Sequence, residues 1–282
     1  MIYNQLFAVS KYRSRSFQGK QTQKRHLMID STQRFTRTVA NYIRYRPDYP
    51  QALLDKIIER TGVNIASSIA DIGAGTGIFS KLLLDNSLSV TAIEPNRYML
   101  GAAKETLSSN PDFRYLNNSA EQTGLTARSV DLICVAQAFH WFNQDKTLVE
   151  FKRVLKPFGY IALIWNQREE QHPFQNQYDS LLVKYATDYQ NINHMNMPQA
   201  QIARFFAPGE MHTFDFTNAQ QFDLNGLIGR IKSCSYCPHE DSTDFSELSQ
   251  ALERLFDEYS QDGLINFDYN CKLYIGRLHV PS

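Results

Sequence analysis

The sequence predicts an α/β fold organised around a mainly parallel sheet, and three observations lead to this prediction. The first is a short, mostly apolar segment at residues 65–70, typical of a buried parallel strand, which leads into a glycine-rich loop at residues 71–77. The second is the apolar start of a helix directly after this loop, at residues 78–84. A chain of 282 residues can hold one such domain and an insertion. The third is a series of further strand-length segments, at residues 89–93, 113–117, 130–136 and 160–165.

The spacing of the glycines indicates which nucleotide the loop binds. Glycines allow positive φ angles and a close approach of ligand to main chain, and the helix that follows offers unpaired N–H groups. A dinucleotide-binding turn has the pattern G-x-G-x-x-G, but its third position is occupied here by Ile78. Gly73, Gly75 and Gly77 instead form G-x-G-x-G, and Asp71 stands two places before them. This pattern resembles the first motif of the class I S-adenosylmethionine-dependent methyltransferases, although such a turn can also be purely structural.

The second strand ends in an acidic residue at the spacing expected for a ribose. Glu94 stands 21 residues after Gly73, and an acidic side chain at about this distance accepts hydrogen bonds from both ribose hydroxyls. Pro95 follows it, and Met99 lies on the next helix, either in the core or against the adenine. This feature alone does not separate a methyl donor from NAD.

The third strand leads into residues 119–125. The resemblance to the methyltransferases implies that Ala120 and Glu121 meet the adenine here, through a backbone N–H and a side-chain oxygen. A purine edge offers an acceptor and a donor that suit this pairing.

The fourth strand ends in the sequence Gln-Ala-Phe-His-Trp-Phe at residues 137–142. Ligands of open α/β sheets bind beyond the carboxyl ends of the strands where the strand order switches, so this segment, Gln137 included, is expected over the donor's sulfonium. The string resembles the methyltransferase type 11 group, which includes the trans-aconitate-methyltransferase-like proteins. His140 is either a base or a wall of the pocket, and Trp141 is either an aromatic face for the charged sulfur or a packed wall.

The segment before the glycine loop is predicted to cover the donor. Pro47 and Pro50 exclude a continuous helix, which predicts an ordered turn at residues 42–50 before a helix that begins near Gln51. Tyr-Arg-Pro-x-Tyr-Pro also resembles the type 11 group, in which an N-terminal segment covers the cofactor. Tyr45 and Arg46 would then close over the donor, with Arg46 available to its carboxylate. The alternative is a polar aromatic loop.

The second half of the chain completes the predicted sheet. A helix ends near residue 155, a turn at residues 156–159 enters the fifth strand, and residues 167–208 form a helical insertion predicted to cover the substrate. The family resemblance implies a Rossmann-like seven-stranded sheet of order 3-2-1-4-5-7-6, with strand seven antiparallel and helices on both faces. Residues 28–166 and 209–282 would form this methyltransferase domain. The remaining elements are a strand at 210–222, helices at 224–233 and 244–259, and a last strand at 266–278.

Composition narrows the partners. The hydrophobic fraction of 43% is typical of a soluble globular protein. The formal net charge of zero argues against a dedicated nucleic-acid binder, which would carry a basic excess. No apolar run approaches the length of a membrane span. Four cysteines are too few for a disulfide framework in a chain of this size and predict a reducing compartment, the cytoplasm. Cys234 and Cys237 are spaced C-x-x-C, but they lack a second ligand pair, so no metal is predicted.

The first 27 residues carry basic residues and no acidic ones, and they are predicted to form a disordered extension. Three interpretations are open: an organellar transit peptide, a basic tail, or sequence upstream of a true translation start at Met28. We favour the third.

Together these features predict an S-adenosylmethionine-dependent methyltransferase that acts on a small molecule, as a monomer or homodimer. A sulfonium is already reactive, so the protein must orient an unprotonated nucleophile and exclude water. A carboxylate needs no base, which favours O-methylation of a carboxylate or hydroxyl. The alternatives are a non-catalytic donor-binding protein and an NAD-linked oxidoreductase, which Ile78 disfavours. The predicted catalytic residues are His140 and Trp141. The predicted cofactor-binding residues are Tyr45, Arg46, Asp71, Gly73, Ala74, Gly75, Thr76, Gly77, Glu94, Pro95, Met99, Ala120, Glu121 and Gln137.

Overall fold

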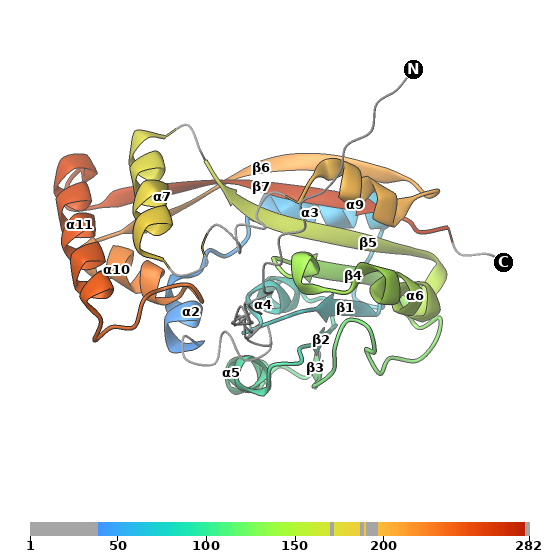
Figure 1. Ribbon diagram of the computed structural model, residues 1–282. Coiled ribbons are helices and arrows are strands. Elements are labelled where there is room, and N and C mark those ends of the chain that lie inside the picture. Colours follow the sequence, from blue (N-terminus) through green and yellow to red (C-terminus); the bar gives the residue numbers. More distant parts are fainter. Residues whose placement is uncertain (1–38, 170–171, 187–188, 190–196, 280–282) are drawn as a thin grey trace, which may run out of the picture.

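A single seven-stranded sheet forms the centre of the molecule (Figure 1). The computed structural model describes residues 39–169, 172–186, 189 and 197–279, so the predicted extension at residues 1–27 lies outside the described residues. The strand order is β3-β2-β1-β4-β5-β7-β6. Strands β1 to β5 pair in parallel, and β7 is antiparallel to both β5 and β6, which confirms the predicted topology. The strands are β1 (Ile69–Ile72), β2 (Val90–Ile93), β3 (Phe113–Leu116), β4 (Val130–Ala136), β5 (Leu155–Arg168), β6 (Met211–Phe222) and β7 (Ile265–Gly276).

Helices cover both faces of this sheet. Side chains of a strand alternate between its faces, so Ile69 packs with α3 and α4 while its neighbour Ala70 packs with α6 and α9. The helices exclude solvent from both faces, where Leu53, Leu83 and Phe151 are fully buried. The helices are α2 (Val39–Tyr45), α3 (Gln51–Thr61), α4 (Ile78–Asp85), α5 (Arg97–Leu107), α6 (Gln144–Val154), α7 (Pro173–Tyr185), α9 (Gln199–Phe206), α10 (Leu224–Lys232) and α11 (Thr243–Tyr259), with a 3-10 turn, η1, at Phe139–Trp141.

A third hydrophobic cluster lies at one end of the sheet, where α7, α10 and α11 pack on the first half of β7. We call these three helices the helical lobe. Figure 1 shows β5, β6 and β7 running on beyond the short strands to reach it. Phe174, Tyr178 and Phe267 are fully buried at its centre, with Phe267 edge-on to both other rings. The predicted insertion at residues 167–208 therefore divides: α7 joins the lobe, whereas α9 packs on the sheet.

Three local predictions were wrong. The first strand begins at Ile69, because residues 64–67 form a turn in which Asn64 accepts hydrogen bonds from two later N–H groups. Residues 156–159 belong to β5, which starts at Leu155 opposite Val130 and is held there by an ion pair between Lys156 and Asp131 (2.7 Å). The predicted turn at residues 42–50 begins as helix α2, which ends only at Tyr45.

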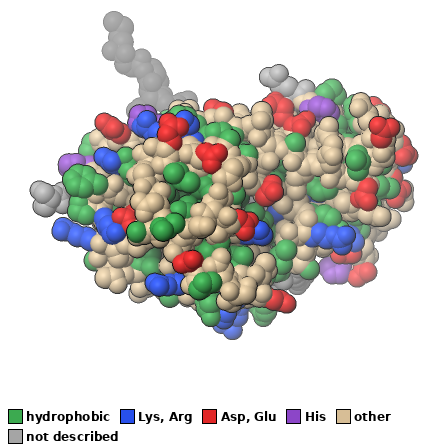
Figure 2. All heavy atoms as spheres, turned by 180° about the vertical axis from the view of Figure 1, so that it is seen from behind, with side chains coloured by type: hydrophobic (Ala, Val, Ile, Leu, Met, Phe, Trp, Pro, Cys, Tyr) green, Lys and Arg blue, Asp and Glu red, His purple; other side chains and the backbone are tan. Residues whose placement is uncertain are grey.

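Surface charge is mixed. Acidic and basic side chains are interspersed over the face seen in Figure 2, as expected of a chain with no net charge. Within the described ranges, no helix is both long enough and apolar enough to span a membrane.

Candidate functional site

The glycine loop after β1 has a backbone that only glycine adopts without strain. Gly73, Gly75 and Gly77 have φ angles of 74°, 58° and 82°. A Cβ atom on Gly73 would lie 2.4 Å from the Cβ of Ala138, so the loop and the end of β4 approach too closely for any side chain. The Gly73 N–H donates to the carbonyl of Ile93 (2.8 Å), which ties the loop to the end of β2.

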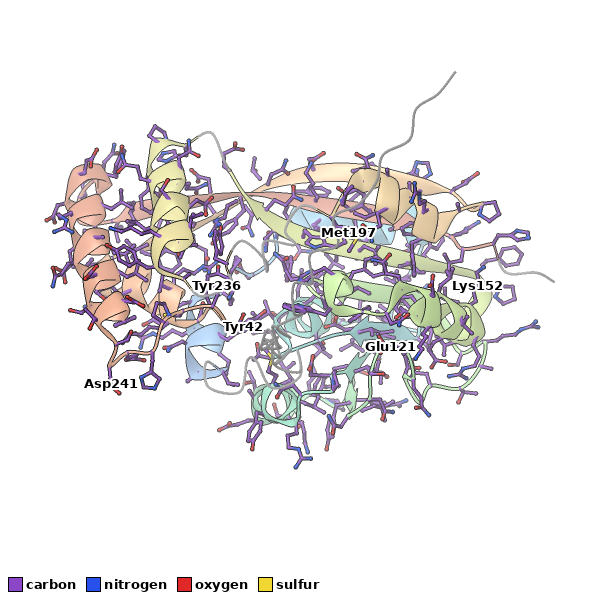
Figure 3. All side chains as sticks on the ribbon, viewed as in Figure 1. Tyr42, Glu121, Lys152, Met197, Tyr236 and Asp241 are labelled. Carbon is purple, nitrogen blue, oxygen red and sulfur yellow. The ribbon has the colours of Figure 1, made fainter. Side chains whose placement is uncertain are left out.

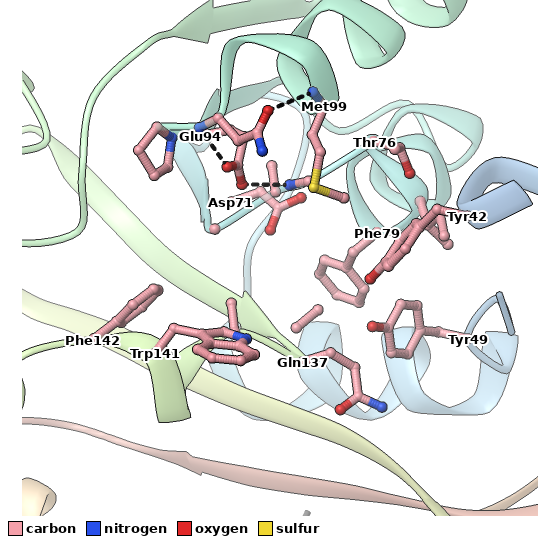
Figure 4. A pocket seen from close by; sticks show the side chains of 18 residues that line it. Tyr42, Tyr49, Asp71, Thr76, Phe79, Glu94, Met99, Gln137, Trp141 and Phe142 are labelled. Atoms are coloured by element: carbon pink, nitrogen blue, oxygen red, sulfur yellow. Dashed lines mark hydrogen bonds between the residues drawn. The ribbon is translucent and has the colours of Figure 1, made fainter. Parts of the chain in front are cut away.

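A first cavity opens over this loop, at the carboxyl ends of β1, β2 and β4 (Figure 4). Gly77 is the N-terminal cap of α4 and is not among the residues that line this cavity. The cavity is lined by Tyr42, Tyr49, Asp71, Gly73, Ala74, Gly75, Thr76, Ile78, Phe79, Glu94, Pro95, Asn96, Met99, Ala136, Gln137, Ala138, Trp141 and Phe142.

Asp71 gives this cavity an unusual carboxyl group. Its side chain is fully buried, and Oδ2 accepts a hydrogen bond from the Ser80 hydroxyl (2.6 Å). Oδ1 is also buried and has no hydrogen-bond partner in the described part of the chain. Burial raises the pKa of Asp71 to about 7, although the Ser80 hydrogen bond opposes this shift. A carboxyl group at the cavity wall with one oxygen that has no described hydrogen-bond partner is suited to a cationic ligand.

Glu94 links the glycine loop to the end of β2. Its Oε2 accepts from the Gly75 N–H (2.9 Å) and its Oε1 from the Asn96 N–H (2.8 Å). Burial raises the pKa of Glu94, and these two backbone hydrogen bonds oppose the shift. Asn96 in turn caps α5 by accepting from the N–H groups of Tyr98 and Met99. The carboxylate thus fixes the two backbone segments that form one wall of the cavity (Figure 4).

A second cavity adjoins the first and shares five wall residues with it: Tyr42, Tyr49, Ile78, Gln137 and Trp141. Three arginines line it, and among the described lining residues there is no aspartate or glutamate. Figure 3 shows Tyr42 on α2 and Tyr236 beyond α10, both on the lobe side of the molecule. The other lining residues are Arg46, Pro47, His140, Asn166, Arg168, Tyr189, Arg230, Ser235, Tyr236 and Tyr269.

Most of the predicted site residues meet at these two cavities. The first cavity contains Asp71, Gly73, Ala74, Gly75, Thr76, Glu94, Pro95, Met99, Gln137 and Trp141, while Arg46 and His140 line the second.

Four predicted residues line neither cavity: Gly77, the cap of α4, and Tyr45, Ala120 and Glu121. Tyr45 lines neither cavity, since its ring lies against Gly229 of α10. Ala120 is buried in the sheet core, and the Glu121 carboxylate accepts a hydrogen bond from the Asn143 N–H (2.8 Å). Figure 3 shows Glu121 away from Tyr42 and Tyr236, on the side of β4.

Sequence reasoning missed Tyr42 and Tyr49, which stand between the two cavities. Because α2 continues to Tyr45, residues four apart share a face, and the Arg46 guanidinium lies 4.9 Å from the centre of the Tyr42 ring. Recognising the helix would have paired Arg46 with Tyr42 instead of Tyr45. Tyr49 packs edge-on against Phe79 (5.2 Å between ring centres) and was present in the Tyr-Arg-Pro-x-Tyr-Pro string.

Comparison with known proteins assigns the class. The model of a methyltransferase domain family matches residues 70–163. An uncharacterized methyltransferase of Schizosaccharomyces pombe is 30% identical over 226 residues, which cover 78% of this chain and 88% of that protein. A protein of Saccharomyces cerevisiae named a probable S-adenosylmethionine-dependent methyltransferase is 31% identical, over 76% of this chain and 72% of its own length. The chain belongs to the S-adenosylmethionine-dependent methyltransferases.

A solved structure supports the same fold. It is that of a protein from Anaeromyxobacter dehalogenans assigned as a type II methyltransferase, with a TM-score of 0.62 and 20% identity. The match covers 83% of this chain and all of the other. Membership of the methyltransferase family identifies the methyl donor as S-adenosylmethionine. The first cavity fits this donor, because it has a glycine cradle with no room for a Cβ at Gly73 and a buried oxygen of Asp71 without a described partner for a cationic ligand.

Proposed function

We propose that this protein methylates a carboxylate oxygen of a small organic acid, with the donor in the first cavity and the acid in the second. The observation that carries the proposal is the lining of the second cavity, which contains Arg46, Arg168 and Arg230 and no acidic side chain among its described residues. Guanidinium groups bind carboxylates through paired hydrogen bonds. The two cavities share walls, so an acid held in one lies next to a donor held in the other.

In this proposal the first cavity binds and orients the donor. When bound, S-adenosylmethionine supplies a methyl group on a positively charged sulfur, which keeps the bonding electron pair as the methyl group leaves. We assign Glu94 to the ribose and Asp71 to a cationic part of the molecule, since both line the first cavity. Tyr42, Tyr49 and Trp141 supply aromatic faces where the two cavities meet.

The second cavity needs to orient the acid and keep it dry. A carboxylate is ionised at neutral pH, so no side chain has to remove a proton. Arg46 and His140 line the cavity near the shared wall and can orient the reacting group. We assign the water-excluding role to the helical lobe and to the predicted insertion at residues 167–208, from which Arg168 and Tyr189 reach the cavity.

The test is a transfer assay with isotopically labelled S-adenosylmethionine and matched carboxylic acids and phenols. A base-labile methyl ester formed from an acid supports the proposal. A base-stable ether formed only from phenols would show hydroxyl methylation, which His140 could assist as a base and which would contradict a carboxylate acceptor. Tight donor binding without transfer to any acceptor would indicate a non-catalytic donor-binding protein.

A variant of His140 separates the two chemistries. For a carboxylate acceptor, His140→Gln is expected to change KM for the acid while kcat stays within a few-fold, since no proton is transferred. For a hydroxyl acceptor, kcat would fall by about 100-fold or more and the pH profile would lose one limb. Donor affinity, measured by calorimetry, should match that of the wild type in either case.

A further inference from the structure

Two arginines of the second cavity are deeply buried but differ in their counter-charges. Arg168 and Arg230 are only 7% and 4% exposed. Arg168 forms an ion pair with Asp179 of α7 and a hydrogen bond with the Tyr189 hydroxyl. Its charge is therefore compensated within the protein.

Arg230 has no such partner among the described residues. Its Nε donates to the Tyr269 hydroxyl (3.5 Å) and its Nη1 to the sulfur of Cys234 (3.3 Å), and no described carboxylate lies within ion-pair distance. The C-terminal end of α10 adds only the partial negative charge of its carbonyl groups. A buried cation without a counter-ion costs several kcal/mol, so the cavity is electrostatically prepared for an anion at Arg230.

Cys234 is the group that can supply this negative charge in the absence of a ligand. As a thiolate its sulfur accepts from Arg230 Nη1, and as a thiol it can donate to the carbonyl oxygen of the same residue, 3.5 Å away. Burial acts to raise the pKa of Cys234, but Arg46, Arg230, Tyr236 and Arg168 outweigh it and lower that pKa overall. Cys237, three residues on, is the opposite case: burial raises its pKa to about 12, so it stays a thiol.

The charge state of Cys234 depends on titratable groups from several elements that pack around it. Arg46 reaches in from the end of α2 and donates to the carbonyl of Ser233 (3.1 Å). The remaining titratable groups are neutral at physiological pH, because burial raises the pKa values of Tyr178 and Tyr236. The groups that face Cys234 are thus Arg46 beyond α2, Arg168 of β5, Tyr178 of α7, Arg230 of α10, and Tyr236 and Cys237 in the segment that follows α10.

We propose that Arg230 is the anion-binding residue of the second cavity and that Cys234 is its resident partner, which gives up Arg230 and takes back one proton when an anionic acceptor binds. This inference rests on the proposed function for the identity of the acceptor. The proton comes from the solvent, and no covalent bond changes. Acceptor binding is then coupled to proton uptake, and acceptor affinity falls as the pH rises and the thiolate competes for Arg230.

The test uses the full-length protein saturated with S-adenosylhomocysteine, so that no transfer occurs. Acetate, benzoate and succinate serve as anionic probes, and acetamide, benzamide and succinamide as neutral counterparts. Calorimetric titrations in buffers of different ionisation enthalpy give the number of protons taken up. We expect the carboxylates, and not the amides, to bind with net proton uptake near and above the pH at which Cys234 ionises.

Three variants identify the residues. Cys234→Ser should bind the carboxylates with no proton uptake and lose the weakening at high pH, whereas the matched control Cys237→Ser should behave as the wild type. Arg230→Met should weaken the carboxylates by about tenfold or more, the scale of a charged hydrogen bond, and leave the amides unchanged. The affinity for S-adenosylhomocysteine shows whether each variant is folded. If Arg230→Met does not fold, the carboxylate affinity of Arg230→Lys and the proton uptake of the wild-type protein test the proposal instead.

The proposal is overturned if carboxylates bind without proton uptake, or if uptake persists in Cys234→Ser. These results are independent of the proposed function, which fails separately if no carboxylic acid accepts the methyl group in the transfer assay. Unchanged carboxylate binding in a folded Arg230→Met variant would likewise show that Arg230 is not the anion-binding residue.

Discussion

In the proposed donor site, Asp71 is the residue whose ionisation we expect to couple to binding of the methyl donor. Burial raises its pKa to about 7, and a bound cation would favour the ionised form. We therefore expect donor affinity to rise as the pH increases from about 6 to about 8. Asp71→Asn should weaken the donor by about tenfold at the upper end, the scale of a charged hydrogen bond, and should flatten this pH dependence. Calorimetry across the range would measure both effects, and an unchanged slope in the variant would contradict this role.

The same carboxyl has the opposite effect on stability. Its folded-state pKa lies above the unfolded value of 3.8, so stability is greatest below that value and is lost as the pH rises through about 7. Asp71→Asn should remove this loss. Near pH 8 the free energy of unfolding of the variant, measured with urea, should exceed that of the wild type by up to a few kcal/mol, while the variant binds the donor less well. A variant less stable than the wild type at that pH would show that the Ser80 hydrogen bond dominates.

Gly73 and Gly101 provide a matched pair of glycine substitutions. Ala at Gly73 would have a positive φ angle and a Cβ 2.4 Å from that of Ala138, so we expect Gly73→Ala to cost more than the roughly 1–2 kcal/mol of the backbone strain alone. Donor binding should be lost. Gly101 lies on α5 with nothing within 4 Å of the added Cβ, and Gly101→Ala should stabilise by about 0.5–1 kcal/mol. Thermal unfolding of both variants with and without donor measures these effects. Equal changes in stability would contradict the close approach of the Gly73 backbone to Ala138.

At the scale of secondary-structure elements, the ion pair of Arg168 with Asp179 joins α7 to the end of β5. Asp179→Asn would leave the buried Arg168 guanidinium without its counter-charge, at an expected cost of about 3 kcal/mol in urea unfolding. The control is Asp215→Asn, whose partner Lys272 (2.8 Å) is on the surface, with an expected effect below about 1 kcal/mol. Equal losses in the free energy of unfolding of the two variants would show that burial of Arg168 does not determine the cost of removing its counter-charge.

The elements that could be predicted from sequence are those with a local cause. Helix α4 begins at Ile78 because a glycine loop precedes it, and α11 follows an apolar stripe that includes Leu248, Leu252 and Leu255. The extension of β5 back to Leu155 had no local signal, because Pro157 and Gly159 favour a turn and only the pairing with β4 makes this segment a strand. The start of α2 was obscured in the same way by the prolines that follow it.

For the whole molecule, the two cavities differ in how they are encoded. Most of the first is formed at the ends of strands and by the segments that follow them, so a pattern of a few residues identifies Asp71, Glu94 and Gln137. The second takes Arg168, Arg230 and Tyr269 from three distant parts of the chain, which only the packing of the helical lobe brings together. No local pattern marks them, which is why the sequence predicted the donor and not these three residues.

This division predicts how the two ligands protect the molecule from hydrogen exchange. S-adenosylhomocysteine should slow exchange in residues 73–78, 94–99 and 137–142, which contain most of the residues that line the first cavity, and around Tyr42 and Tyr49. Adding a carboxylate should extend protection to α10 and residues 233–236, because Arg230, Ser235 and Tyr236 line only the second cavity. Helix α11 lines neither and serves as the internal control. Protection of α10 by the donor product alone, with no further change on adding the acid, would mean that the lobe responds to the first cavity and that the two sites are not separate.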